Sequence, residues 1–143
     1  MQLSKDLKRT LTNELRYCAE KMNKERDARK KAFFFSNASD SLSAVLDLEY
    51  DPQLVLMDLV LEVSSATISN RVETVSNERE APVGLIDGMF DRLYVLLNKL
   101  ADNIEEKSDV YITLQGIAEI AFLSTDRGYY ISTKGLKAWT ADK

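Results

Sequence analysis

Apolar residues recur every three or four positions through the first twenty-two residues of the chain. The stripe consists of Leu3, Leu7, Leu11, Leu15, Cys18 and Met22. This spacing is typical of an amphipathic helix, because residues three and four positions apart lie on one face. Ser4 is a suitable N-cap, and Asp6 would lie near the positive end of the helix dipole. The pattern predicts a first helix over about residues 4–23.

Three further apolar stripes predict helices over about residues 27–49, 52–77 and 82–106. Asp27 is a suitable cap for the second helix. The third begins at "DP", Asp51 followed by Pro52, which is typical of an N-cap and the first helical position. The fourth helix has the clearest stripe, formed by Ile86, Met89, Phe90, Leu93, Leu97, Leu100 and Ile104.

The third predicted helix is apolar on most of its circumference between residues 54 and 63. We expect its polar stripe to face solvent; this stripe is Asp58, Glu62, Ser65, Ser69 and Ser76. A helix that is apolar nearly all round is either surrounded within a bundle or paired with another chain. The pattern therefore predicts a central helix or one that pairs with a second copy.

The C-terminal segment, about residues 112–140, fits two structures. Leu114, Ile117, Ala118, Ala121 and Phe122 suit a short helix. The same region also suits a β-hairpin around "TDRG", because β-branched and aromatic residues flank a glycine. We therefore predict one all-α domain over residues 1–143. Its architecture is a four-helix, mostly antiparallel bundle with a short C-terminal appendage that is either helix or hairpin.

The amino-acid composition excludes several kinds of catalysis. The 143 residues include no histidine and one cysteine, Cys18. Neither a Ser-His-Asp triad nor a Cys-His pair can therefore form, nor can a zinc site that needs histidine or several cysteines. We expect no cofactor and regard an enzymatic role as the less favoured one. The single cysteine, the lack of a leader and the lack of a long apolar run favour a cytoplasmic protein outside the membrane.

Paired carboxylates are the candidates for metal binding that remain. Asp58 and Glu62 are four residues apart, as are Asp87 and Asp91, so each pair lies on one helix face. Two such pairs that faced each other could bind Mg²⁺, which prefers oxygen ligands. The favoured interpretation is that Asp58 and Glu62 belong to the solvated stripe of their helix.

Charge is divided unevenly along the chain. Residues 1–31 hold ten basic and five acidic residues, a balance of +5, whereas residues 32–143 hold nine basic and eighteen acidic residues, a balance of −9. Such a division bears on association with charged partners. Within "ARKKAFFF", Phe33 could stack on a base beside basic residues, but the favoured interpretation is that the phenylalanines cover the inner side of a helix.

The last forty residues resemble the end of a winged-helix DNA-binding domain. The resemblance is carried by Tyr129, Tyr130, Ile131, Thr133, Lys134 and Gly135, and it implies that Arg127 lies at the tip of a two-stranded wing. The residues that would contact nucleic acid are then Lys5, Lys8, Arg9, Arg16, Lys24, Arg26, Arg29, Lys30, Lys31, Arg127 and Lys134.

Three functions follow as hypotheses. The leading one is a non-enzymatic interaction or adaptor protein, acting as a homo-oligomer or with another protein through its long helices. The alternative is association with nucleic acid through the basic first helix and the winged-helix-like segment. A magnesium-dependent carboxylate enzyme is the third and least favoured hypothesis.

Overall fold

The computed structural model describes residues 3–76 and 83–129, and this part of the chain contains helices and no strands. The helices are α1 (Lys5–Lys24), α2 (Ala28–Leu48), α3 (Pro52–Ser76), α4 (Val83–Glu106) and α5 (Tyr111–Ser124). The all-α class predicted from the sequence is confirmed. The bounds of the first four helices lie within two residues of the predicted ranges.

The first three helices begin at the caps that the sequence indicates. The Ser4 hydroxyl accepts a hydrogen bond from the Leu7 amide at 3.3 Å. The Asp27 carboxylate accepts one from the Arg29 amide at 3.2 Å. The buried carboxylate of Asp51 accepts two, from the amides of Gln53 and Leu54 at 2.9 and 3.1 Å. Each cap satisfies amides that have no partner within the helix, which fixes where the helix begins.

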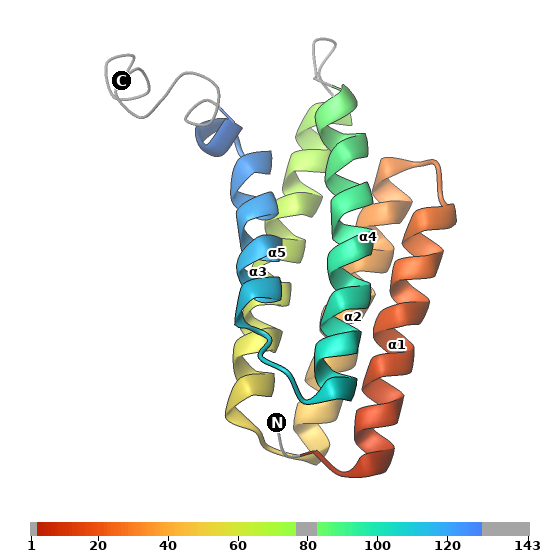
Figure 1. Ribbon diagram of the computed structural model, residues 1–143. Coiled ribbons are helices and arrows are strands. Elements are labelled where there is room, and N and C mark those ends of the chain that lie inside the picture. The colour runs from red at the N-terminus through yellow and green to blue at the C-terminus, as the bar shows by residue number, and fades with distance from the viewer. Residues whose placement is uncertain (1–2, 77–82, 130–143) are drawn as a thin grey trace.

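Successive helices run in opposite directions, and together they form a closed ring (Figure 1). α1 packs between α2 and α4, and α2 packs in turn against α3. α5 packs against both α3 and α4, so it lies between two helices that follow each other in the chain. The ring order is therefore α1, α2, α3, α5 and α4.

Of the two structures expected for the C-terminal segment, the helix is correct for residues 111–124, but it packs as a fifth helix of the bundle and not as an appendage. Its buried residues include Leu114, Ile117 and Ile120. The "TDRG" segment is also no hairpin turn, because residues 126–129 form a helical turn. Glycine is required there for another reason: a Cβ atom on Gly128 would overlap the carbonyl oxygen of Phe122. The second expected strand and the short helix from Lys134 fall mainly outside the described residues.

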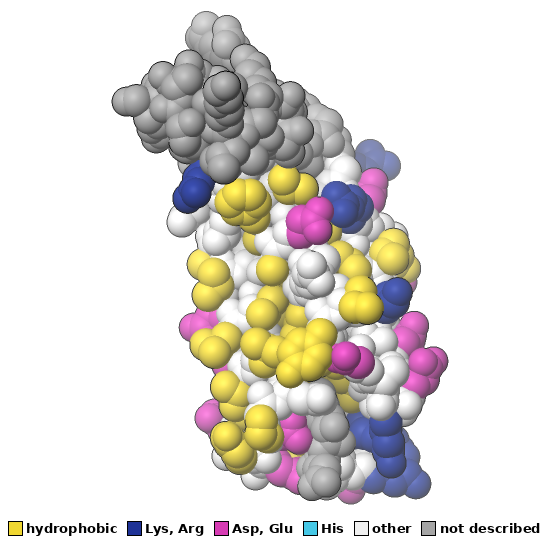
Figure 2. Space-filling view, turned by 60° about the vertical axis from the view of Figure 1, so that its left-hand side comes forward, with side chains coloured by type: hydrophobic (Ala, Val, Ile, Leu, Met, Phe, Trp, Pro, Cys, Tyr) yellow, Lys and Arg dark blue, Asp and Glu magenta, His cyan; other side chains and the backbone are white. Residues whose placement is uncertain are grey.

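α3 differs from the expectation in which side faces solvent. Leu54, Met57 and Leu61 are buried as the stripe predicts, but Ser65, expected on the solvated side, is only 6% exposed. Glu62 is exposed as expected, but the outward side also carries Leu59 and Val63. These side chains contribute to an apolar area over α3 and α5 that is visible in Figure 2.

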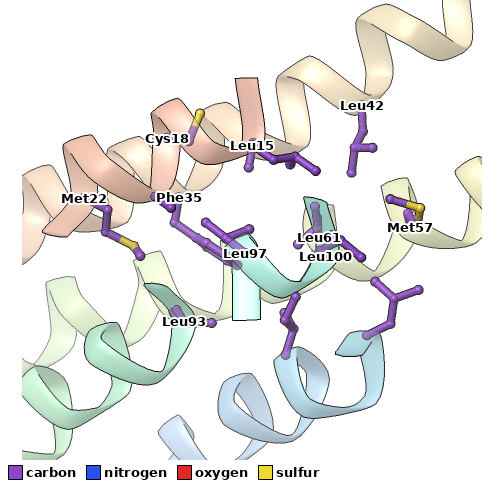
Figure 3. Close-up of a cluster of buried hydrophobic side chains, with 14 of the residues drawn as sticks. Leu15, Cys18, Met22, Phe35, Leu42, Met57, Leu61, Leu93, Leu97 and Leu100 are labelled. Atoms are coloured by element: carbon purple, nitrogen blue, oxygen red, sulfur yellow. The ribbon is translucent and has the colours of Figure 1, made fainter. Parts of the chain in front are cut away.

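The core fills the space enclosed by the five helices. Figure 3 shows side chains from α1, α2, α3 and α4 that point toward one another, among them Leu15, Phe35, Leu61 and Leu97. These four side chains are at most 1% exposed. The inward side of every helix contributes to this core. The exposed apolar side chains of α3 and α5 lie outside it.

Candidate functional site

An apolar groove with a volume of about 420 Å³ lies between α3 and α5. On the α3 side it is lined by Leu59, Val60, Val63, Ser64 and Thr67, and on the α5 side by Ala118, Ala121, Phe122 and Thr125. No ionisable side chain is among these residues. The groove can therefore bury apolar surface, but it offers no acid, base or nucleophile beyond hydroxyl groups.

The groove combines large side chains at its rim with small ones at its base. Leu59, Val63 and Phe122 are 54%, 64% and 44% exposed. In contrast, Ser64 and Ala121 are buried, and their short side chains leave the space that forms the hollow. Figure 2 shows the apolar side chains continuing along this face, whose residues come from two helices distant in the sequence.

An ion pair lies beyond one end of the groove, next to Thr67 and Thr125. Arg71 of α3 donates to the Asp126 carboxylate at 2.6 Å, and only 10% of the Arg71 side chain is exposed. The Thr125 hydroxyl donates to the carbonyl oxygen of Phe122 at 2.6 Å and accepts from the Gly128 amide at 3.0 Å. These bonds hold the turn that follows α5 against α3.

The structure does not bring the two acid pairs together. Asp58 is half-buried and accepts a hydrogen bond from the Ser43 hydroxyl of α2 at 2.7 Å, while Glu62 is exposed. Asp91 is exposed near the start of α4, and because α3 and α4 run in opposite directions it lies at the other end of the bundle from Asp58. The side chain of Asp87 lies outside the description. Within residues 3–76 and 83–129 no group of three or more acidic or cysteine side chains is placed to hold a metal ion.

The basic residues predicted to contact nucleic acid are divided among several places. Arg16 bonds to Asp102 and Glu105 of α4, each at 2.9 Å. Burial lowers the pKa of Arg16, but the hydrogen bond to Asp102 and the charge of Glu105 outweigh it and raise the pKa. The guanidinium of Arg29 donates hydrogen bonds to both carboxylate oxygens of Glu73 on α3, at 2.8 and 3.1 Å. Lys31 donates to the carbonyl oxygen of Met22 at 3.1 Å.

The remaining predicted cations do not converge on one face. Lys5, Lys8 and Arg9 lie in the first two turns of α1, whereas Lys24, Arg26 and Lys30 lie at its other end, around the α1–α2 connection. Arg127 is exposed in the helical turn after α5, a helix packed against α3 and α4 and not against α1. The expected place of Arg127 at a wing tip is therefore wrong. Lys134 lies outside the described residues.

Sequence reasoning missed the groove because its base residues carry no chemical signature. Ala118 and Ala121 indicate only a short helix, and no local pattern shows that this helix lies between α3 and α4. Comparison of the chain with known protein families, curated proteins and solved structures gave no match. None of the described helices is long and apolar enough to cross a membrane.

Proposed function

We propose that this chain is a non-enzymatic interaction protein that pairs with a second copy of itself through the face formed by α3 and α5. The proposal rests on the positions of the large apolar side chains that are exposed to solvent. Eleven such side chains are exposed among the described residues, and three of them, Leu59, Val63 and Phe122, line one groove between these two helices. Contiguous exposed apolar surface of this kind is typical of a protein interface.

The face is suited to a second copy because it offers both projecting and receiving surface. Leu59, Val63 and Phe122 project from the surface. Between them lies the hollow over Ser64 and Ala121, which has room for a large side chain. In a two-fold symmetric pair each copy presents the same patch to the other, so a patch must contain its own complement. The groove lining holds no charge that such pairing would leave buried without a partner.

The size of the face agrees with this occupant. α3 has 25 residues and is about 37 Å long, α5 has 14 residues and is about 21 Å long, and each helix is about 10 Å wide, so the face covers roughly 600 Å². A stable pair of proteins commonly buries about 800 Å² on each partner. The face is therefore near the lower limit of size for a dimer, so we expect dissociation on dilution.

Val63→Glu tests the proposal, and Val95→Glu is its matched control. Val63 and Val95 are 64% and 60% exposed, on α3 and α4 respectively, so both substitutions should leave the fold intact. We expect the natural chain and Val95→Glu to sediment with twice the monomer mass of 16.2 kDa at high concentration. Val63→Glu should remain monomeric, because a carboxylate would be buried without a partner.

Two results would overturn the proposal. One is a natural chain that stays monomeric from about 1 to 500 µM, a range that covers weak protein pairs. The other is a dimer that Val63→Glu and Val95→Glu affect equally, which would place the interface elsewhere. Circular dichroism of both variants checks that the helices are retained.

A further inference from the structure

Two aromatic side chains stand exposed near the α1–α2 connection, on the far side of the bundle from the groove. Tyr17 of α1 is 56% exposed and Phe33 of α2 is 59% exposed. The favoured interpretation of the sequence, that the three phenylalanines cover an inner face, is correct for Phe35, which is 1% exposed, and for half-buried Phe34, which packs against the core, but wrong for Phe33. Adjacent helix positions are 100° apart, so a run of three cannot all face inward. Phe33 packs edge-on against half-buried Phe34, with ring centroids 5.5 Å apart.

Basic residues surround the two rings. Lys21 and Lys24 follow Tyr17 by four and seven positions, so they share its helix face, and Lys30 precedes Phe33 by one turn. The Lys21 ammonium lies 5.5 Å from the centre of the Tyr17 ring. Arg26 lies in the connection itself. All four cations are exposed, and none has an ion-pair partner within the described part of the chain.

Two of the three acids interspersed with these cations are bound by other groups, whereas Glu25 lies between Lys24 and Arg26. Glu20 accepts a hydrogen bond from the Tyr94 hydroxyl of α4 at 2.8 Å, and this bond raises the pKa of Tyr94. Asp27 caps α2. Glu73, which lies near the same end, is paired with Arg29. The surface therefore has four exposed cations outside any ion pair of the described residues, with the carboxylates of Glu20, Glu25 and Asp27 among them, beside two exposed aromatic rings.

We infer that this surface, formed by Tyr17, Lys21, Lys24, Arg26, Lys30 and Phe33, binds single-stranded nucleic acid. Exposed rings offer flat faces on which unpaired bases stack, and flexible cations follow the phosphates between them. Duplex bases are already stacked and have no free face for Phe33 or Tyr17. The inference is independent of the α3–α5 face, because it uses other helices and another side of the molecule.

Fluorescence anisotropy with a labelled oligothymidine of about twelve nucleotides tests the inference, since sites of this kind span about 4–16 nucleotides. We expect saturable binding at low salt. Four phosphate contacts to a single strand predict a slope of log affinity against log salt of about −3. A duplex of the same length should bind more weakly at every salt concentration.

Aromatic substitutions separate stacking from simple charge attraction. Phe33→Ala and Tyr17→Ala should each weaken binding about five- to a hundred-fold. Tyr50→Ala is the matched control, because Tyr50 is 76% exposed in the α2–α3 connection, at the other end of α2 from Phe33, and its loss should leave the affinity unchanged. Likewise Lys30→Gln should flatten the salt slope by about 0.7, whereas Lys99→Gln on α4 should not.

Three outcomes would overturn the inference. The first is the absence of saturable binding at about 50 mM salt, where phosphate contacts are strong. The second is binding that Phe33→Ala and Tyr17→Ala leave unchanged, which would show a sequence-blind attraction to any polyanion. The third is tighter association with anionic phospholipid vesicles than with the oligonucleotide, which would make the surface a membrane contact.

Discussion

The thiol of Cys18 lies in the core, as its place in the apolar stripe of the first helix predicts. It is 2% exposed, and burial together with the charges of Glu14 and Asp40 raises its pKa to about 11. The thiolate is the reactive form of cysteine. At neutral pH the folded chain therefore holds Cys18 both protonated and inaccessible.

We predict that Cys18 reacts with a thiol reagent at least a hundred-fold more slowly in the folded chain than in denaturant at pH 8. The unfolded thiol ionises near pH 9, so between pH 9 and 11 ionisation favours unfolding and stability falls. Cys18→Ala should lack this part of the pH dependence. Rapid labelling of the native chain at pH 8 would contradict the burial.

Single residues also show how far local patterns can be interpreted. The caps at Ser4, Asp27 and Asp51 are predictable because each acts on amides two or three positions away. The surface positions of Leu59, Val63 and Phe33 are not predictable in this way. Where nearly every side of a helix is apolar, or where three phenylalanines are consecutive, the pattern has no single inward direction. Only the neighbouring helices decide which side is covered.

At the scale of elements, the turn between α4 and α5 explains how the fifth helix reaches its place. The Lys107 amide donates to the Ile104 carbonyl oxygen at 3.4 Å, and the Ser108 amide donates to that of Asn103 at 2.9 Å. This is the Schellman pattern, which commonly places glycine in the left-handed region at the position held here by Lys107. Lys107 has a φ of 57°, a conformation that costs a residue with a Cβ atom more than glycine.

We predict that Lys107→Gly stabilises the chain by about 0.5–1 kcal/mol, because the strain at this position is removed. Lys107→Ala is the control: it removes the same charge but keeps the Cβ atom, so it should give no gain. Chemical denaturation of the three chains provides the measurement. Equal stabilities for Lys107→Gly and Lys107→Ala would show that the turn carries no strain.

For residues 111–124 the sequence does not decide between a helix and a strand. Their β-branched residues, including Ile112, Thr113 and Ile117, suit a strand as well as a helix. Side-chain bonds to α4 support the helix: the Thr113 hydroxyl donates to the Asn103 side-chain oxygen at 2.6 Å. Asn103 lies on α4, so the apolar pattern of residues 111–124 does not indicate this contact.

For the whole molecule, the ring of helices determines where the candidate sites lie. α5 separates α3 from α4, which creates the apolar groove and also keeps the acid pairs of those helices apart. The same arrangement places Arg127 away from the basic residues of α1. Four helices and their order along the chain were predictable from periodicity, whereas the groove depends on a packing order that the sequence does not display.

If α5 closes the ring, damage to its inner side must lower the stability of the entire bundle. Ile117 is fully buried and Ile112 of the same helix is 76% exposed, so Ile117→Ala and Ile112→Ala form a matched pair. We predict a loss of about 2–4 kcal/mol for Ile117→Ala and less than about 0.5 kcal/mol for Ile112→Ala. Cys18 provides a distant probe on α1: in Ile117→Ala its labelling should begin at the same lowered denaturant concentration at which the helical signal is lost. Unchanged protection of Cys18 in that variant would instead make α5 a separable attachment, because α1 would then stay packed while α5 unfolds.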